Sequence, residues 1–254
     1  MTTEIEKIMR SNVELVLPTI TQILAYHTYE SNPENWLTGG TGFFVDTGIN
    51  KFLVTANHVY EEIKRLGVNS DVSMYIGGAG KPPHDIMEWT LIDQNADVDI
   101  CIIQIPANFD FQFYGKRCLA PQTWPPARAS VGDKSFTLGF PAERRNAVQN
   151  GVIGGASGIA DSITNVGPYN FILADETDAR ESIVLVNPAK EIKMYGGMSG
   201  SSIFAAREDG YFEPVGVFIE SGGFVDGIHA PFFGSHLDVI DSSGFIISNM
   251  IPPR

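Results

Sequence analysis

Two short apolar runs follow one another within residues 40–59, which read GTGFFVDTGINKFLVTANHV. The runs are Thr41–Asp46 and Lys51–Ala56, and a segment with Gly and Asn separates them. Short runs of β-branched and aromatic residues, bounded by turn-forming residues, are typical of β-strands. The stretch therefore predicts two strands, after which the polar residues Asn57 and His58 begin a predicted helical turn.

Strands of this kind recur along the chain, with clusters of Gly, Asn, Asp and Pro between them. The further predicted strands are Ile20–Tyr26, Asp71–Ile76, Met87–Ile92, Asp99–Ile105, Lys134–Phe140, Gly151–Ile159, Phe171–Leu173, Ser182–Val186, Ser201–Ala205 and Pro214–Glu220. They do not alternate with helices, which disfavours a doubly wound α/β sheet. The pattern predicts an all-β sandwich or pair of barrels, divided by a proline-rich stretch at residues 121–126.

The amino-acid composition limits the classes of partner that the protein is expected to bind. The 254 residues hold 17 Lys and Arg against 30 Asp and Glu, a formal net charge of −13. Binding to nucleic acid or to an anionic membrane surface needs a surplus of basic side chains, so we expect neither. Cys101 and Cys118 are too few for a disulfide framework or a zinc cluster, and Cys101 is predicted to be a buried apolar residue. Without a signal-type segment or a run of about 20 apolar residues, we expect a soluble, cytoplasmic protein with no cofactor.

His58 has a setting that the other four histidines, His27, His84, His229 and His236, lack. It follows the apolar run Phe52–Ala56, with only Asn57 between them. A side chain at the end of a rigid strand is well placed to act as a general base. The alternative is a histidine with a structural role only.

Ser199 lies within residues 195–204, which read YGGMSGSSIF. The glycines allow a tight turn that projects the hydroxyl outward. They also allow the N–H groups of Gly197 and Ser199 to converge on one point, where they would stabilise an oxyanion. The alternative is a turn whose small residues have no chemical role.

Asp99 stands at the start of the apolar run Ile100–Ile105. A carboxylate there either ends the strand in water or accepts a hydrogen bond from an imidazole and fixes its tautomer. Asp97 competes for the second role, but Asp99 is preferred because it directly adjoins the apolar run. The chain then supplies a base, a carboxylate and a nucleophile in the order His58, Asp99, Ser199, which is the order of chymotrypsin.

Four motifs carry a resemblance to a known family. Gly40–Val45 with Leu53–Val59 resembles the histidine signature of chymotrypsin-fold (trypsin-like) serine peptidases, and Asp99–Ile103 resembles their aspartate strand. Val131–Pro141 is similar to the opening of the second barrel in bacterial members, and Gly197–Ile203 to the serine loop. Together the matches span roughly residues 38–222 of the chain.

The resemblance implies two six-stranded antiparallel β-barrels with an active site in the crevice between them. It implies His58 as general base and acid, Asp99 as its orienting carboxylate, Ser199 as nucleophile, and the Gly197 and Ser199 amides as oxyanion hole. The domain boundaries expected on this basis are an N-terminal arm or short helix at residues 1–12, an N-terminal barrel at 13–120, a linker at 121–130, a C-terminal barrel at 131–245 and a tail at 246–254.

The chain also departs from the family pattern. Animal digestive members have Asp immediately before the serine, paired with a new amino terminus, whereas this chain has Met198 and no matching start. It is more similar to the bacterial and viral branch, without a PDZ domain. By the resemblance, Lys193, Ile219, Glu220 and Ser221 line the substrate pocket. An inward Lys193 would favour acidic substrate side chains; the alternatives are that it extends into solvent or pairs with Glu220.

The sequence therefore predicts a serine endopeptidase that acts on proteins or peptides through an acyl-enzyme. The alternative is a protease-like domain that binds a partner, or an enzyme gated by an activating protein. A third hypothesis, an α/β-hydrolase that pairs Ser199 with His229 or His236, lacks the glycine two residues after the nucleophile.

Overall fold

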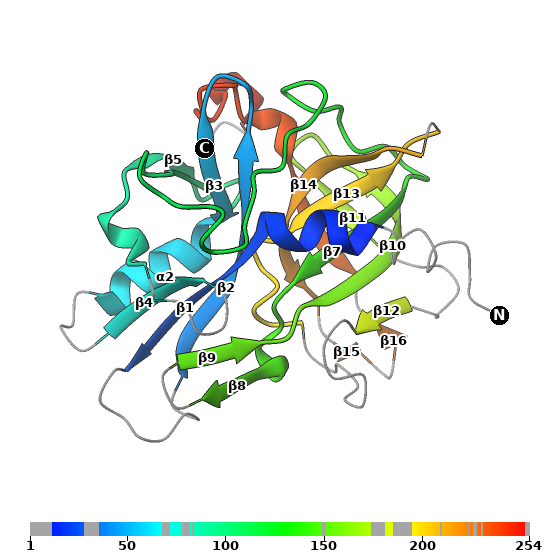
Figure 1. The fold of residues 1–254 in the computed structure, drawn as a ribbon. Helices are drawn as coiled ribbons and strands as arrows, with labels where there is room; N and C mark the ends of the chain where they lie inside the picture. Colours follow the sequence, from blue (N-terminus) through cyan, green and yellow to red (C-terminus); the bar gives the residue numbers. More distant parts are fainter. Residues whose placement is uncertain are drawn as a thin grey trace.

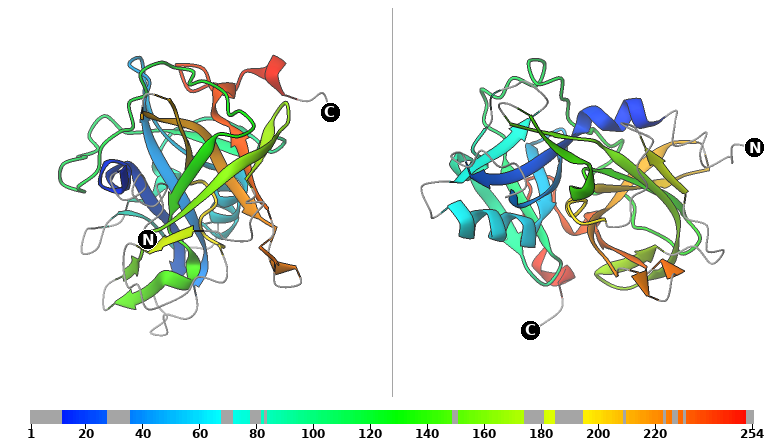
Figure 2. Two further views of the ribbon diagram at one scale, coloured as in Figure 1. Left: turned by 90° about the vertical axis from the view of Figure 1, so that its right-hand side faces the viewer. Right: turned by 90° about the horizontal axis from the view of Figure 1, so that it is seen from below.

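The structure is a computed structural model that describes residues 12–27, 36–67, 72–77, 82, 84–148, 151–173, 181–184, 195–208, 210–222, 224–225, 228–229 and 231–251. Within these ranges the chain forms two antiparallel sheets, which lie side by side (Figures 1 and 2). No helix in the described ranges combines the length and the apolar character needed to cross a membrane.

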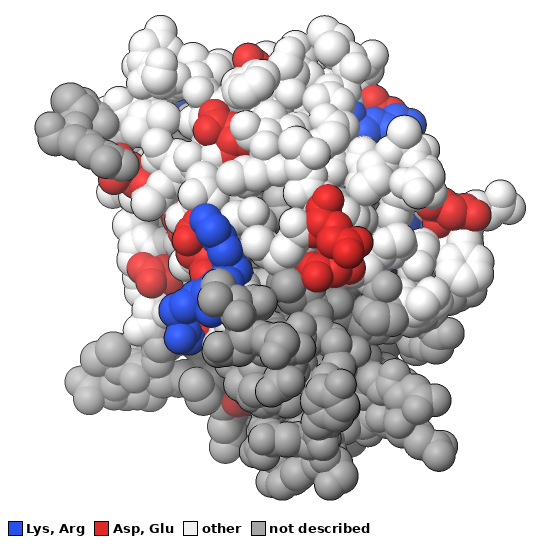
Figure 3. All heavy atoms as spheres, turned by 90° about the vertical axis from the view of Figure 1, so that its left-hand side faces the viewer, with Lys and Arg blue, Asp and Glu red and all other residues white. Residues whose placement is uncertain are grey.

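The first sheet comes from the first half of the chain and has the strand order β4-β1-β2-β3-β6-β5. Its strands are β1 (Ile20–His27), β2 (Trp36–Asp46), β3 (Lys51–Ala56), β4 (Val72–Gly77), β5 (Leu91–Asn95) and β6 (Ile100–Gln104). Helix α2 (Asn57–Gly67) follows β3 without a loop and packs against this sheet (Figure 1). Figure 3 views the molecule from the side on which α2 lies, where basic side chains lie beside acidic ones; on α2, Arg65 pairs with Glu62.

The second sheet closes into a ring. Its strands are β7 (Lys134–Gly139), β10 (Ser157–Val166), β11 (Asn170–Leu173), β12 (Glu181–Val184), β13 (Ser202–Ala206), β14 (Phe212–Ser221) and β17 (Phe232–His236). Their order is β11-β17-β14-β13-β7-β10-β12, and β10 also pairs with β11, so six strands form a closed barrel to which β12 is added. Two small hairpins, β8 (Arg145–Val148) with β9 (Gly151–Gly154) and β15 (Phe224–Val225) with β16 (Ile228–His229), lie outside it.

Short helical segments connect and flank the strands. Residues 12–16 are helical and continue into η1 (Leu17–Thr19). The others are η2 (Ile86–Glu88), η3 (Ala142–Arg144), η4 (Leu237–Val239) and η5 (Ser248–Met250). After η4 the chain returns to the first sheet, where the backbone N–H of Ile246 donates to Asp93 Oδ2. Both halves of the chain are therefore held together by more than the linker.

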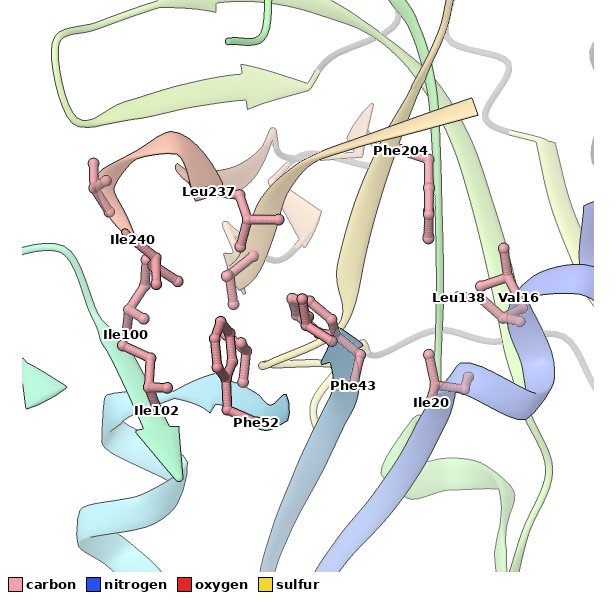
Figure 4. Close-up of a cluster of buried hydrophobic side chains, with 14 of the residues drawn as sticks. Val16, Ile20, Phe43, Phe52, Ile100, Ile102, Leu138, Phe204, Leu237 and Ile240 are labelled. Atoms are coloured by element: carbon pink, nitrogen blue, oxygen red, sulfur yellow. The ribbon is translucent and has the colours of Figure 1, made fainter. Parts of the chain in front are cut away.

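Three apolar clusters follow from the alternation of side chains along the strands. On β2, Phe43 and Val45 belong to a cluster between the sheets. Phe44 points to the other face of β2 and belongs to a second cluster, which includes Ile63 of α2. The cluster between the sheets also takes Leu138 and Phe204 from the second sheet (Figure 4). The third cluster fills the second barrel. The close-packed apolar contacts of the first cluster fix the two sheets relative to each other.

The prediction of an all-β fold with two antiparallel, barrel-type units is confirmed. Two expected strands differ in detail. The strand expected at Met87–Ile92 begins only at Leu91, because Asp85 accepts a hydrogen bond from Met87 N and starts the helical turn η2 instead. The strand expected at Gly151–Ile159 is interrupted at residues 155–156. Cys101 is buried, as predicted, and Cys118 is half-buried.

Candidate active site

His58 and Asp99 are joined by two hydrogen bonds. Nδ1 of His58 lies 2.6 Å from Oδ2 of Asp99, and the backbone N–H of His58 donates to Oδ1 at 2.8 Å. The pair is possible because β3 and β6 are neighbours and Ala56 lies opposite Ile100 in their register. Both carboxylate oxygens are therefore used to fix one residue at the start of α2, where the helix N-terminus favours negative charge.

The backbone of Asp99 adopts the left-handed conformation, with φ of 50°, and no other described non-glycine residue has a positive φ. This conformation costs energy for residues with a side chain, although Asp and Asn tolerate it best. Its carbonyl also accepts a hydrogen bond from Asn57 N at 3.1 Å. Such local strain is concentrated at functional sites, and here it turns the carboxylate towards His58.

The environment of His58 favours the protonated ring. The hydrogen bond to Asp99 raises the pKa of His58 above its ordinary value, burial of the ring opposes this, and the charges of Asp99 and Glu220 raise the pKa further. The His58 side chain is 52 % exposed, whereas that of Asp99 is 16 % exposed. Because Nδ1 faces Asp99, Nε2 is the ring nitrogen left to exchange a proton with a ligand.

Residues Tyr195–Ser201, the serine loop, are held from both sheets. Thr41 of β2 donates its backbone N–H to Ser199 O at 2.8 Å and its hydroxyl to Gly197 O at 2.9 Å. On the other side, Gly200 N donates to Phe218 O of β14 at 2.7 Å. Ser199 therefore lies at the junction of the two sheets.

Gly40 and Gly200 bring Ser199 close to the start of α2. A Cβ atom at Gly40 would lie 2.7 Å from the side chain of Val59 and 2.9 Å from Ser199 O. A Cβ atom at Gly200 would lie 2.9 Å from Ala56 N and 2.0 Å from Thr41 O. Only glycine permits these backbone approaches, which place the serine loop beside the residues that flank His58.

Two peptide groups of the serine loop are oriented by hydrogen bonds to their carbonyl oxygens. Gly196 O accepts from Ala142 N at 2.6 Å, and Met198 O accepts from Ser201 N at 2.9 Å and from Ser201 Oγ at 2.6 Å. In a trans peptide the N–H points away from the C=O. The N–H groups of Gly197 and Ser199 therefore point away from these partners, and in the described part of the chain neither donates a hydrogen bond. Gly197 and Ser199 are only half-buried, so these two donors are candidates to bind a ligand oxygen.

The Ser199 hydroxyl forms no hydrogen bond with His58 or with any other residue that the structure describes. Ser199 itself is half-buried. Hydrogen bonds between a nucleophile and its base often form fully only when substrate is bound. The structure thus brings His58 into contact with Asp99 and places the backbone of the serine loop beside residues that flank His58.

The sequence also suggested four pocket residues, a competing carboxylate and other histidines for the site. Ile219, Glu220 and Ser221 form the end of β14; Glu220 is exposed and the other two are half-buried. Lys193 lies outside the described residues. Asp97, the competing carboxylate, is exposed in the turn before β6, where its N–H bonds to Asn95 Oδ1. His236 is buried in the second sheet and bonds to Gly167 O through Nε2.

A role in orienting the serine loop was not predicted for Thr41, Ser201 or Ala142. Thr41 and Ser201 are fully buried, and all three orient the serine loop through hydrogen bonds. In the sequence, the position of Thr41 between Gly40 and Gly42 is the feature that could have indicated this role. In the described ranges, no three His, Cys, Asp or Glu residues are grouped so that they could hold a metal ion.

Comparison with known proteins agrees with this arrangement. A family model described as a trypsin-like peptidase domain matches residues 40–212, more than half of the chain. The chain belongs to the trypsin-like peptidases. The matched residues include His58, Asp99 and Ser199 as well as Thr41 and Gly200. A search of curated proteins finds no match to this peptidase.

Two solved structures match this trypsin-like peptidase at low sequence identity, and the first of them shares its fold. The crystal structure of Deg5 matches with 14 % identity and a TM-score of 0.51, over 93 % of this chain and 92 % of that one. A structure from work on the Sesbania mosaic virus VPg protein and its coupled folding and binding matches with 13 % identity and a TM-score of 0.45, over 85 % of each chain. The chain is a chymotrypsin-fold serine peptidase by family.

Proposed function

We propose that this trypsin-like peptidase is a serine endopeptidase that cleaves peptide bonds through an acyl-enzyme, with Ser199 as nucleophile. The observation that carries the proposal is the hydrogen bond of 2.6 Å between His58 Nδ1 and Asp99 Oδ2. It fixes the tautomer in which Nε2 can accept a proton, and it stabilises the imidazolium that results.

In the first half of the reaction, Ser199 Oγ attacks the carbonyl carbon of the scissile peptide bond while Nε2 of His58 takes the hydroxyl proton. The carbonyl oxygen becomes negatively charged and accepts hydrogen bonds from the N–H groups of Gly197 and Ser199. The carbon–nitrogen bond then breaks, and His58 gives its proton to the departing amine.

In the second half, water attacks the ester formed on Ser199. His58 again takes a proton, now from water, and returns it to Ser199 Oγ as the new carboxyl group leaves. The Gly196–Gly197 and Met198–Ser199 peptide groups are already held by Ala142 and Ser201, so the donors need not reorganise during the reaction.

Labelling with a fluorophosphonate tests this proposal. Ser199 Oγ should displace fluoride from phosphorus, and mass spectrometry should locate the adduct on Ser199. The Ser199→Ala protein should give no adduct and no cleavage of a casein substrate. Ser202→Ala is the matched control, because the Ser202 hydroxyl is buried and has no hydrogen-bond partner among the described residues; it should label normally.

A folded protein without an adduct on Ser199 would contradict the proposal. It would favour the alternative of a protease-like domain that binds a partner. If the adduct forms only after another protein is added, the enzyme is gated by a partner.

A further inference from the structure

The end of strand β14 has a free edge next to the serine loop. β13 begins at Ser202, which lies opposite Val217 of β14. Beyond that pair, Phe218 is still bonded to the serine loop, because its carbonyl accepts from Gly200 N and its N–H donates to Ser201 O. From Ile219 onwards, the described residues place a strand on only one side of β14, namely β17.

Glu220 is exposed on this free stretch, two residues beyond Phe218. The pairing of β14 with β17 has an irregularity between these two residues, and two residues of a strand span at most about 7 Å, so the carboxylate lies near the position of a ligand bound to Ser199. Its charge is felt at His58 on the other sheet, where it raises the pKa of the imidazole. Contacts between β14 and β3 bring the two strands close together.

No basic partner for Glu220 is present among the described residues, unlike the case of Glu213 and Asp238. Glu213, on the same strand, pairs with Arg207 at 2.8 Å, and Asp238 pairs with Arg128 at 2.9 Å. Asp99, the other acidic group of the site, pairs with His58. Within the described residues, the charge of Glu220 is therefore not neutralised by a cation.

We propose that Glu220 binds a lysine or arginine side chain of the substrate, located within about three residues of the scissile bond. This proposal rests on the proposed endopeptidase function and adds the substrate class. An extended peptide whose scissile carbonyl group lies at Ser199 can pair with the free edge of β14. The spacing of its residues along this edge is then about the same as that of the residues of β14. A cationic side chain would then reach Glu220, whereas an acidic one would be repelled.

A charge-exchange experiment tests the proposal. A cleaved peptide is varied one position at a time, up to three residues on each side of the scissile bond, with Lys, Gln or Glu. At one position the wild-type enzyme should prefer Lys over Glu by roughly 3- to 10-fold in kcat/KM, the range of an exposed ion pair and its repulsive counterpart. Glu220→Gln should abolish the preference, and Glu220→Lys should reverse it. Added salt should weaken it.

Glu208 provides the matched control. It is exposed near the opposite end of β14, in the connection from β13, so Glu208→Gln should leave the preference unchanged. Binding of the same peptides to Ser199→Ala protein, measured by fluorescence anisotropy, gives a second readout that needs no turnover. Lys peptides should bind more tightly than Glu peptides, and the order should reverse when Glu220→Lys is added.

Two results overturn the inference. One is active enzyme in which Glu220→Gln and Glu220→Lys leave the profile unchanged; the other is Ser199→Ala protein that binds Lys and Glu peptides equally. The labelling of Ser199 distinguishes these results from failure of the proposed function, because an unselective enzyme still forms the adduct.

Discussion

The hydroxyl of Thr41 donates a hydrogen bond of 2.9 Å to the carbonyl oxygen of Gly197, a residue 156 positions later in the chain. The same hydroxyl accepts a bond from Phe140 N at 3.0 Å. One buried side chain of the first sheet thus satisfies two backbone groups that belong to the second half of the chain. The position of the serine loop depends on this contact as well as on its own sequence.

Replacing Thr41 with valine should destabilise the protein and slow catalysis. The two backbone groups would lose their bond to the Thr41 hydroxyl, at a cost of about 1–3 kcal/mol in the free energy of unfolding. Release of the serine loop should also lower kcat by about tenfold, equivalent to about 1.4 kcal/mol. Urea denaturation and steady-state kinetics measure the two effects.

Thr21→Val is the matched control, because the Thr21 hydroxyl is buried in β1 and, in the part of the chain that the structure describes, has no hydrogen-bond partner. This change should leave kcat unaltered and should not lower stability. Equal losses in both variants would mean that the Thr41 contact has no special role.

Ser201→Ala should lower kcat with little change in KM. The Ser201 hydroxyl bonds to Met198 O at 2.6 Å, and this holds the peptide group that presents the Ser199 N–H. Without it, the oxyanion donor is less well oriented, and we expect a loss of about tenfold, smaller than removal of a donor itself. The neighbouring Ser202→Ala, which removes an unpaired hydroxyl, should retain wild-type kcat. An unchanged kcat in Ser201→Ala would contradict the assigned positioning role.

Asp99→Asn should shift the pH profile as well as reduce the rate. In the proposed mechanism activity requires neutral His58, so its raised pKa places the acidic limb of kcat/KM at a higher pH than an ordinary histidine would give. Removal of the Asp99 carboxylate should lower this pKa, so the limb moves to lower pH. The plateau should fall by about 10⁴-fold, as in other triads with this change.

Asp97→Asn serves as the control for Asp99→Asn, because Asp97 is an exposed residue in the adjacent turn. Its pH profile should match that of the wild type. NMR titration of His58 would measure the pKa directly in both variants. If His58 titrates at the same pH in Asp99→Asn and in the wild type, the assigned cause of the raised pKa is wrong.

Gly200→Ala should be far more destabilising than Gly48→Ala. Both glycines have a positive φ, 89° and 82°, so each substitution carries a conformational cost of about 1–2 kcal/mol. At Gly200 the new Cβ would also lie 2.0 Å from Thr41 O, whereas at Gly48 nothing lies within 4 Å. We expect a total loss of more than about 3 kcal/mol at Gly200, measured by thermal unfolding. Similar losses in the two variants would show that the close approach is relieved at no cost.

The sequence indicated most strands because they depend on local pattern. The contact between His58 and Asp99 depends in addition on the pairing of β3 with β6, and it was expected from the family resemblance. Apolar runs between turn residues marked most strands, and the adjoining run Ile100–Ile105 distinguished Asp99 from Asp97. Strand β17, Phe232–His236, was not predicted because Gly234 interrupts its pattern. The structure explains that glycine: a Cβ there would lie 2.6 Å from Ile203 Cδ1 and 2.7 Å from the ring of Phe171.

The supporting contacts could not be predicted from the sequence for a different reason. Thr41, Ala142 and Ser201 act on the serine loop through backbone carbonyls, and any hydroxyl or amide could supply such a bond. Which residue does so depends on how the sheets pack. The catalytic roles of His58, Asp99, Ser199 and Gly197 stay predictions, as do the pocket residues and the domain boundaries.

The closed second barrel has a consequence for biosynthesis. β17 lies between β11 and β14 in the ring, although it follows both in the chain. The ring therefore cannot close on the ribosome before Phe232–His236 have emerged, and pairing between such distant segments is slow. Until the ring closes, β14 lacks its pairing with β17, so Phe218 and the serine loop bonded to it are not yet held in place. A nascent chain should therefore be unable to cleave neighbouring proteins.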